Sequence, residues 1–258
     1  MSPAAELESA SVAIAGRAVL DCASLAVGPG EVMGVVGANG AGKTTLLRAA
    51  LGLVRLTAGV VRLGGRPLGE LSELQRAALA GYLPQERRVA WNMPAWRIVA
   101  LGAAQAPPRE ARRRALAALE EMGLAALAER GVRDMSGGER ARVLIARLLA
   151  TQAPLLVADE PAAGLDPDAA LRILEVLRQR AAGGQAVIAT LHDLTLAARG
   201  CDRLAVMSGG RIVALGPPPE ALSAEVLSQA FRLDGGLVDT PAGWVMAASR
   251  ARPRASDG

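Results

Sequence analysis

A glycine-rich loop lies between an apolar run and a helix-forming segment. In order, its residues are Gly37-Ala38-Asn39-Gly40-Ala41-Gly42-Lys43-Thr44-Thr45. They match G-x-x-x-x-G-K-[ST], the pattern of a phosphate-binding loop. Glycines at 40 and 42 allow successive backbone N–H groups to point at phosphate oxygens. Lys43 can reach the β- and γ-phosphates and the Thr44 hydroxyl can ligate Mg²⁺, so the loop predicts a nucleotide site.

The segments on either side of the loop support this interpretation. The apolar run 32–36 reads as a buried parallel strand, and residues 46–51 favour a helix whose positive end faces the same anion. The alternative is a glycine-rich turn without a ligand. Of the 29 basic residues, 28 are arginine and Lys43 is the only lysine. A compact ammonium suits a phosphate, which favours the binding site over the turn.

Composition excludes several classes of protein. No uncharged apolar run approaches the ~18 residues of a membrane span, and residues 1–10 lack the apolar core of an export signal. Cys22 and Cys201 have no metal-ligand spacing, which indicates thiols in a reducing cytoplasm. The net charge is +4, but the run 112–114 lies beside glutamates, and aromatic residues make up only 2%. We therefore expect a solvated helix face and no nucleic-acid partner.

Strands alternating with helices around the loop predict an α/β fold with a mostly parallel sheet core. Short apolar stretches separated by glycines over residues 8–36 indicate a small antiparallel β subdomain. Residues 86–151 are rich in Arg, Ala and Leu, which indicates a helical subdomain. We expect one domain over residues 1–235 and a C-terminal tail over 236–258, with a disordered end at 249–258.

An apolar strand at 154–158 ends in two acids, Asp159 and Glu160. The first acid can hold a metal ion or its waters, and the second can polarise an attacking water. Acids also end many strands without any catalytic role. The phosphate loop upstream favours the catalytic interpretation.

Two further motifs are weak alone, and their functional interpretation depends on the acidic pair and the phosphate loop. Residues Ser136, Gly137 and Gly138 open a helix and can form a second anion cradle, or only a loop with an N-cap. His192, the single histidine, ends a buried strand. A lone histidine is more often structural, but a strand end lies at the ligand-binding edge of an open α/β sheet.

Taken together and in this order, these motifs resemble those of the ATP-binding subunits of ABC transporters. The resemblance covers about residues 8–235 and implies a P-loop NTPase fold of the ABC cassette type. Its motifs are the phosphate loop, a glutamine loop, a Leu-Ser-Gly-Gly signature, the acidic strand end, an Ala-Leu-Asp loop and a histidine switch. By position they correspond to 37–45, Gln85, Ser136–Glu139, Asp159–Glu160, 164–166 and His192.

The resemblance also implies roles for these residues. It makes Glu160 the general base, places His192 at the γ-phosphate, and gives Gln85 the tasks of sensing Mg²⁺ and linking to the membrane partner. Thr44, Gln85 and Asp159 then form the metal-binding set for an ATP–Mg²⁺ complex.

Two positions depart from the family pattern. The signature begins with Met135 in place of leucine, a change that conserves volume. The family stacks adenine on an aromatic residue about 25 residues before the phosphate loop, where this chain has Ile14. The first aromatic residue of the whole chain is Tyr82.

The segment 190–203, together with 81–85, resembles the subfamily that serves iron-siderophore, haem and cobalamin importers. The resemblance then implies a peripheral ATPase at the cytoplasmic face of the cell membrane, bound to separate permease subunits. It also implies a head-to-tail homodimer and an indirect partnership with a substrate-binding protein. The alternatives are an exporter subunit, a soluble ABC-type ATPase acting on nucleic acid or ribosomes, and a regulator that does not hydrolyse ATP. The intact Glu160 argues against the last.

Trp91 and Trp96 follow the glutamine loop and flank a Pro94 break. Both indoles could fill the core of the helical subdomain, or at least one could line a groove for a permease helix.

Overall fold

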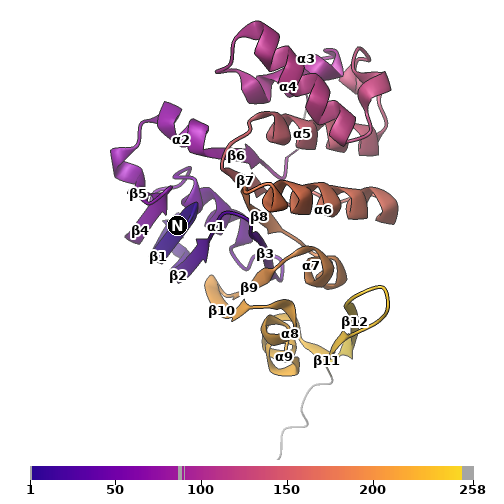
Figure 1. Ribbon diagram of the computed structural model, residues 1–258. Helices are drawn as coiled ribbons and strands as arrows, with labels where there is room; N and C mark the ends of the chain where they lie inside the picture. The colour runs from indigo at the N-terminus through magenta and orange to yellow at the C-terminus, as the bar shows by residue number, and fades with distance from the viewer. Residues whose placement is uncertain (1, 87–88, 90, 252–258) are drawn as a thin grey trace, which may run out of the picture.

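A six-stranded sheet forms the centre of the computed structural model, which describes residues 2–86, 89 and 91–251 (Figure 1). The strands lie in the order β10, β9, β3, β8, β7, β6. All neighbours are parallel except β9 and β10, which form an antiparallel hairpin. The bounds are β3 (Val32–Gly37), β6 (Ala80–Leu83), β7 (Leu155–Ala158), β8 (Ala186–Thr190), β9 (Arg203–Ser208) and β10 (Arg211–Gly216).

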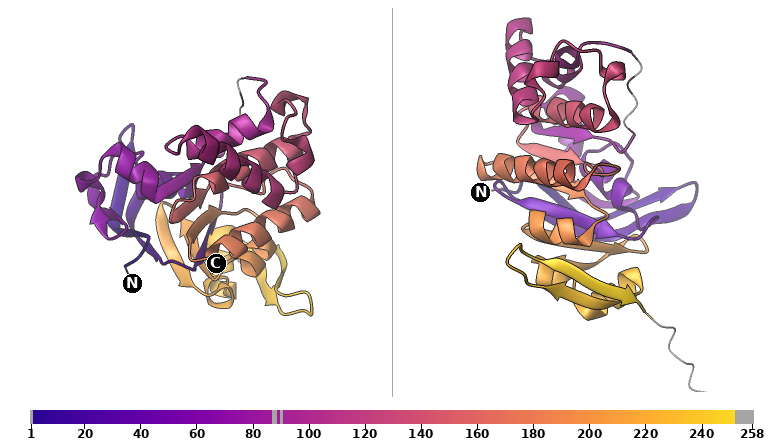
Figure 2. Two further views of the ribbon diagram at one scale, coloured as in Figure 1. Left: turned by 45° about the horizontal axis from the view of Figure 1, so that its top comes forward. Right: turned by 90° about the vertical axis from the view of Figure 1, so that its right-hand side faces the viewer.

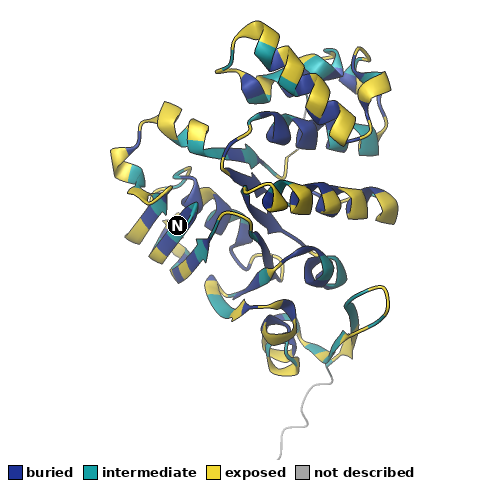
Figure 3. Ribbon diagram, in the orientation of Figure 1, coloured by how far each residue is buried: buried dark blue, intermediate teal, exposed yellow. Residues whose placement is uncertain are grey.

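The central strand β3 is buried on both faces, as a parallel strand between two layers must be. Val32 and Val36 belong to a core cluster with residues of α5 (Gly137–Ala150), α6 (Pro167–Ala182) and α7 (Leu194–Gly200). Met33 and Val35 pack into a second cluster with α1 (Lys43–Ala50) and the antiparallel sheet. Side chains alternate along a strand, so one apolar run supplies both layers. Figure 3 shows the buried strands between these two layers.

The second sheet is antiparallel and has the strand order β2, β1, β4, β5. Its strands are β1 (Ala5–Ile14), β2 (Arg17–Val27), β4 (Ala58–Leu63) and β5 (Arg66–Pro67). Its chain continues through η1 (Leu68–Glu70) into α2 (Glu73–Leu79). Ser72 caps α2 by accepting a hydrogen bond from Gln75 N, and Gln75 Oε1 accepts one from Ser72 N.

The helical subdomain lies at one end of the molecule, beyond β6 (Figures 1 and 2). Its elements are α3 (Ala95–Ala100), η2 (Leu101–Ala103), α4 (Pro108–Glu121), η3 (Ala125–Leu127), η4 (Val132–Asp134) and α5. Small residues of α4, among them Ala115 and Ala118, are buried and allow α4 to lie close to α3 and α5. The predicted fold class, a mostly parallel sheet with an antiparallel and a helical subdomain, is confirmed.

The two tryptophans of this region have different surroundings. Trp91 is 70% exposed, so its indole is not part of the subdomain core. Trp96 is half-buried against the core cluster. Its Nε1 donates a hydrogen bond of 3.0 Å to Glu129 Oε2, and the Arg112 guanidinium lies 5.1 Å from the ring centroid. The hypothesis that both indoles fill the core is therefore wrong for Trp91.

The C-terminal part follows β10 and lies at the opposite end from the helical subdomain (Figure 1). It contains α8 (Pro218–Ala221), α9 (Ala224–Phe231) and a hairpin of β11 (Leu233–Val238) and β12 (Val245–Arg250). The hairpin is tied to α7, because Met246 N donates to Thr195 Oγ1 and Arg199 Nε donates to Trp244 O. Part of the segment expected as a tail thus forms a hairpin. The expected disorder over 249–258 is wrong for Ser249 and Arg250, which pair in β12, while residues 252–258 lie outside the described residues.

The described helices are short. The longest is α6 with 16 residues, and no described helix combines the length and apolar character needed to cross a membrane.

Candidate nucleotide site

The phosphate loop connects β3 to α1 with a backbone that only glycine adopts easily. Gly40 has φ +79° and Gly42 has φ +100°. A Cβ added at Gly42 would lie 2.7 Å from the carbonyl oxygen of Val19, whereas a Cβ at Gly40 would meet nothing within 4 Å. Gly42 is therefore fixed both by its conformation and by the close approach of β2. The loop backbone at Gly40 borders open space in which a phosphate can lie.

Lys43, the first residue of α1, is only 7% exposed. Its Nζ donates hydrogen bonds to Gly37 O (2.8 Å) and Ala38 O (3.2 Å). Burial lowers the pKa of Lys43, and the negative charges of Glu160 and Asp159 act in the opposite direction. The ammonium is thus held at the loop, on the same side as the two acids at the end of β7.

Asp159 follows β7 and is almost completely buried, with 1% of its surface exposed. Its Oδ1 accepts a hydrogen bond of 2.6 Å from Thr190 Oγ1, and the same hydroxyl accepts one of 2.7 Å from Glu160 N. Asp159 Oδ2 is buried without a hydrogen-bond partner among the described residues. A buried carboxylate oxygen is costly without a partner, and it has the chemistry of a ligand for a hard cation.

The described residues contain no group of three or more His, Cys, Asp or Glu side chains that could hold a metal ion. A Mg²⁺ ion does not need such a group, because proteins bind it through one or two carboxylates together with phosphates and waters. Asp159 fits that role.

Glu160 and His192 approach each other from the ends of β7 and β8. A hydrogen bond joins Glu160 Oε1 and His192 Nε2. Glu160 has φ +53°, a left-handed conformation that costs a residue with a side chain on the order of 1–3 kcal/mol. Its N–H bond to Thr190 helps to hold that conformation. The carboxylate is therefore positioned by two strand ends at the edge of the sheet.

Lys43, Glu160 and His192 line one cleft of about 520 Å³. The structure thus brings together the loop, Glu160, His192 and Gln85, which the sequence proposed as site residues. The lining residues are Val19, Asn39, Gly40, Ala41, Gly42, Lys43, Thr44, Thr45, Gln85, Glu160 and His192.

Three proposed parts of the site do not line this cleft: Asp159, which is buried next to Glu160 in sequence at the end of β7, Ile14 and residues 136–138. Ile14 ends β1 with 51% of its surface exposed. Ser136 caps α5 and is exposed, with its Oγ accepting from Glu139 N and its N–H donating to Glu139 Oε2. Within one chain, the second anion cradle therefore lies apart from the first.

Sequence reasoning missed two residues of the site. Val19 lines the cleft from β2, and Thr190 joins Asp159 to Glu160. A threonine at the end of the otherwise apolar run 186–190 was a signal for a polar role, because a buried hydroxyl needs partners. Nothing in the local sequence of Val19 points to a ligand.

Comparison with known proteins agrees with this geometry. A family profile described as ABC transporter matches residues 20–163. The hemin import ATP-binding protein HmuV of Streptomyces coelicolor is 42% identical over 224 residues, which cover 85% of this chain and 80% of that protein. The chain belongs to the ABC transporter family.

Two further comparisons extend the likeness. The cobalamin import ATP-binding protein BtuD of Halobacterium salinarum is 40% identical over 225 residues, covering 85% of this chain and 56% of that protein. A dimeric ATP-binding cassette, solved in a post-hydrolysis state with ADP and Pi, has a TM-score of 0.74. It is 24% identical, and the likeness covers 83% of this chain and 98% of that chain.

Family membership confirms the predicted resemblance and the predicted enzyme class, an ABC transporter ATPase that binds ATP. The roles of individual site residues stay predictions.

Proposed function

We propose that the chain is the ATP-hydrolysing subunit of an ABC importer for hemin or cobalamin type substrates. The observation that carries this is the cleft around Lys43, Glu160 and His192 in a chain 42% identical to a hemin import ATP-binding protein. The identity to a cobalamin import protein, at 40%, supports the same substrate class. Both substrates are large metal-containing tetrapyrroles. The sequence also suggested siderophores, and no relative described above carries that name.

The proposed chemistry uses the residues of the cleft. The loop N–H groups and Lys43 bind the phosphates of ATP, and Glu160 accepts a proton from the attacking water. His192 orients the Glu160 carboxylate through their hydrogen bond and lies near the γ-phosphate. Thr44, Gln85 and Asp159 would hold Mg²⁺, which would neutralise charge on the β- and γ-phosphates.

We infer a head-to-tail dimer from the two separate cradles. The Ser136 cradle lies outside the cleft of its own chain, so we assign it to the nucleotide bound by a second copy. Solved cassettes of the same fold include a dimer.

The partners we propose are membrane permease subunits, which place the chain at the cytoplasmic face of the membrane, and indirectly a substrate-binding protein. A tagged chain tests this when it is purified from detergent-solubilised membranes and its polytopic partner is identified by mass spectrometry. Proteoliposomes containing both, with ATP on the side of the chain, should then take up hemin or cobalamin.

Three results would contradict the proposal. They are purification with ribosomes or nucleic acid in place of a membrane protein, ATP-dependent movement in the export direction, and uptake of ferric siderophores alone. A Lys43→Ala chain serves as the matched control and should assemble without supporting uptake.

A further inference from the structure

A pocket of about 370 Å³ lies where the C-terminal hairpin meets α6 and α7, and it shares no lining residue with the nucleotide cleft (Figure 1). Its lining includes Arg178 of α6, Arg199 of α7, Cys201, which follows α7, and Trp244, which precedes β12. The remaining lining residues are Ala, Gly and Pro. The pocket therefore exists because the hairpin lies against α7.

Backbone hydrogen bonds hold both arginines at this pocket. Arg199 Nε donates to Trp244 O at 2.7 Å, and Arg178 Nη1 donates to Arg199 O at 3.1 Å. A guanidinium has five N–H donors in a fixed planar fork. Each of the two side chains thus uses one nitrogen to shape the pocket and keeps further donors for a ligand.

The positive charge of this pocket is not compensated by acidic side chains. No lining residue is acidic, and neither Arg178 nor Arg199 forms an ion pair in the part of the chain that the structure describes. Burial raises the pKa of the Cys201 thiol to about 12, so the sulfur is neutral at pH 7.

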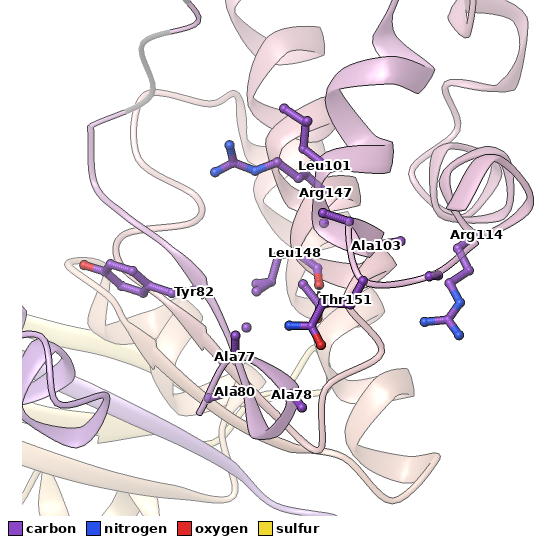
Figure 4. Close-up of a pocket in the computed structure, with 15 residues that line it drawn as sticks. Ala77, Ala78, Ala80, Tyr82, Leu101, Ala103, Arg114, Arg147, Leu148 and Thr151 are labelled. Carbon is purple, nitrogen blue, oxygen red and sulfur yellow. Dashed lines mark hydrogen bonds between the residues drawn. The ribbon is translucent and has the colours of Figure 1, made fainter. Parts of the chain in front are cut away.

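Another groove of the molecule shows the opposite case. Figure 4 shows Arg114 beside a groove of about 630 Å³ that is lined by residues of β6 and α5. Arg114 Nε donates to Glu110 Oε1 at 2.7 Å, so this guanidinium has its counter-ion within the chain. At the C-terminal pocket, the two guanidinium groups leave that place to a ligand.

The chemistry of the pocket matches a doubly charged oxyanion. A phosphate group on a monoester carries a charge of about −1.5 to −2 at pH 7 and has three strong acceptor oxygens. Guanidinium groups bind such oxygens through pairs of parallel hydrogen bonds. A single carboxylate carries one charge and would leave one of the two guanidinium groups uncompensated.

The position of the pocket connects it to the catalytic pair. Arg199 also lines a second cavity of about 400 Å³, whose lining includes Glu160 and His192. Helix α7 begins two residues after His192, and Arg199 is its penultimate residue. A ligand that joins Arg178 to Arg199 therefore braces α7 at the end opposite to His192.

We propose that the pocket of Arg178, Arg199 and Trp244 binds a phosphate group carried by a small soluble molecule, inorganic phosphate or a phosphate monoester. Both guanidinium groups donate hydrogen bonds to its oxygens. The bound group joins α6, α7 and the C-terminal hairpin. Because the site is separate from the nucleotide cleft, phosphate and ATP occupy the chain at the same time.

Calorimetric titration of the full chain tests the site. Inorganic phosphate and glycerol phosphate are titrated at constant ionic strength into Lys43→Ala protein, in which the phosphate loop has lost its ammonium. We expect one bound phosphate per chain, and at least ~10-fold weaker binding when Arg178→Gln is added. Arg109→Gln, exposed on α4, removes the same charge outside the pocket and should leave the affinity unchanged.

The fold of Arg178→Gln is checked by its melting temperature without phosphate. If this variant is unfolded at the temperature of the titration, Arg178→Lys replaces it under the same criterion, because it keeps the charge but loses the planar fork.

Hydrogen–deuterium exchange locates the bound phosphate. In Lys43→Ala protein, phosphate should slow the exchange of backbone amides in α7 and in residues 233–250, and this protection should be absent in the Arg178 variant. Four results overturn the proposal. They are no binding, equal affinity with and without the Arg178 change, protection confined to the phosphate loop, and binding to vesicles of phosphatidic acid without a response to the soluble phosphates.

Discussion

At the scale of single residues, the Glu160 carboxylate is the group whose chemistry is easiest to isolate. Glu160→Gln keeps the size of the side chain and its place beside His192 but removes the base. We expect ATP binding to be retained and turnover to fall by at least ~10²-fold. Binding is measured by titration with a fluorescent ATP analogue and turnover by phosphate release. Glu175→Gln, exposed on α6, is the control, and near-normal turnover in Glu160→Gln would remove Glu160 from this role.

Thr190 has a positioning role that a second variant pair tests. Thr190→Val keeps the shape of the side chain but leaves Asp159 Oδ1 and Glu160 N without their shared hydroxyl. An unsatisfied buried polar group costs about 1–3 kcal/mol, so we expect a lower melting temperature and a kcat reduced by about tenfold or more. Thr190→Ser restores the hydroxyl and should restore kcat. If Thr190→Val lowered the melting temperature but left kcat and its Mg²⁺ dependence unchanged, the Thr190 hydroxyl would contribute to stability and not to positioning Asp159 and Glu160.

Ile14 tests whether the base end of the site lacks an aromatic contact. At 51% exposure on the β1–β2 hairpin, it has room for a larger side chain. An aromatic contact is worth on the order of 0.5–1.5 kcal/mol beyond burial. We therefore expect the wild-type chain to discriminate only weakly between ATP and GTP. The Ile14→Tyr variant should bind ATP several-fold more tightly than the wild type. Equal dissociation constants of the wild type and Ile14→Tyr for ATP would mean that the adenine ring does not contact position 14.

Site residues that lie close together in sequence could be predicted, whereas contacts that form only between neighbouring strands of the sheet could not. The phosphate loop holds its glycines and Lys43 within a few positions, and Asp159 and Glu160 are adjacent in sequence. Thr190 is 30 residues from Glu160, and its bridge exists only because β7 and β8 are neighbours in the sheet.

At the scale of elements, strong local signals gave correct bounds. Asp166 caps α6 and Pro167 begins it, so a capping side chain followed by proline marks the start of this helix in the sequence. The hairpin of β11 and β12 was not predicted, because its residues are at most half-buried and show no clear alternation. Its position depends on contacts with α7 that lie far away in sequence.

The two tryptophans near α3 give an element-scale prediction. Trp96 packs on the subdomain core and donates a hydrogen bond to Glu129, so Trp96→Ala should lower the melting temperature by several degrees. Trp91→Ala removes an exposed indole and should leave the melting temperature and basal ATPase activity nearly unchanged. Calorimetry on both variants checks the contrast. Equal destabilisation by the two would mean that Trp91 also packs in the core.

At the scale of the whole molecule, the two predicted anion cradles of one chain, the phosphate loop and residues 136–138, do not line the same cleft. The fold class could be predicted because each motif specifies a strand end or a helix start, but the separation of Ser136 from the cleft is a property of the assembled chain. In the head-to-tail dimer that we propose, the Ser136 cradle of one chain would complete the phosphate loop of the other. This arrangement makes each site depend on both copies.

Mixtures of two inactive variants distinguish this dimer from a chain that acts alone. Ser136→Arg disrupts the cradle at residues 136–138, and Lys43→Ala removes the ammonium of the phosphate loop. We therefore expect each pure variant to be inactive. A mixed dimer contains one site with an intact loop and an intact cradle. With equal mixing and independent sites, about a quarter of wild-type activity should return.

Glu160→Gln mixed with Lys43→Ala is the matched control. Glu160 lines the cleft of its own phosphate loop, so under the proposed roles neither site of that mixed dimer is intact and activity should stay absent. Dimers carrying two different affinity tags are isolated, and phosphate release is measured for each pair. The isolated dimer of Ser136→Arg with Lys43→Ala has one intact site of two and should therefore show about half of wild-type activity. Recovery in both mixtures, or in neither, would contradict the head-to-tail arrangement, because only that arrangement pairs the intact Ser136 cradle with the loop and base of the opposite chain.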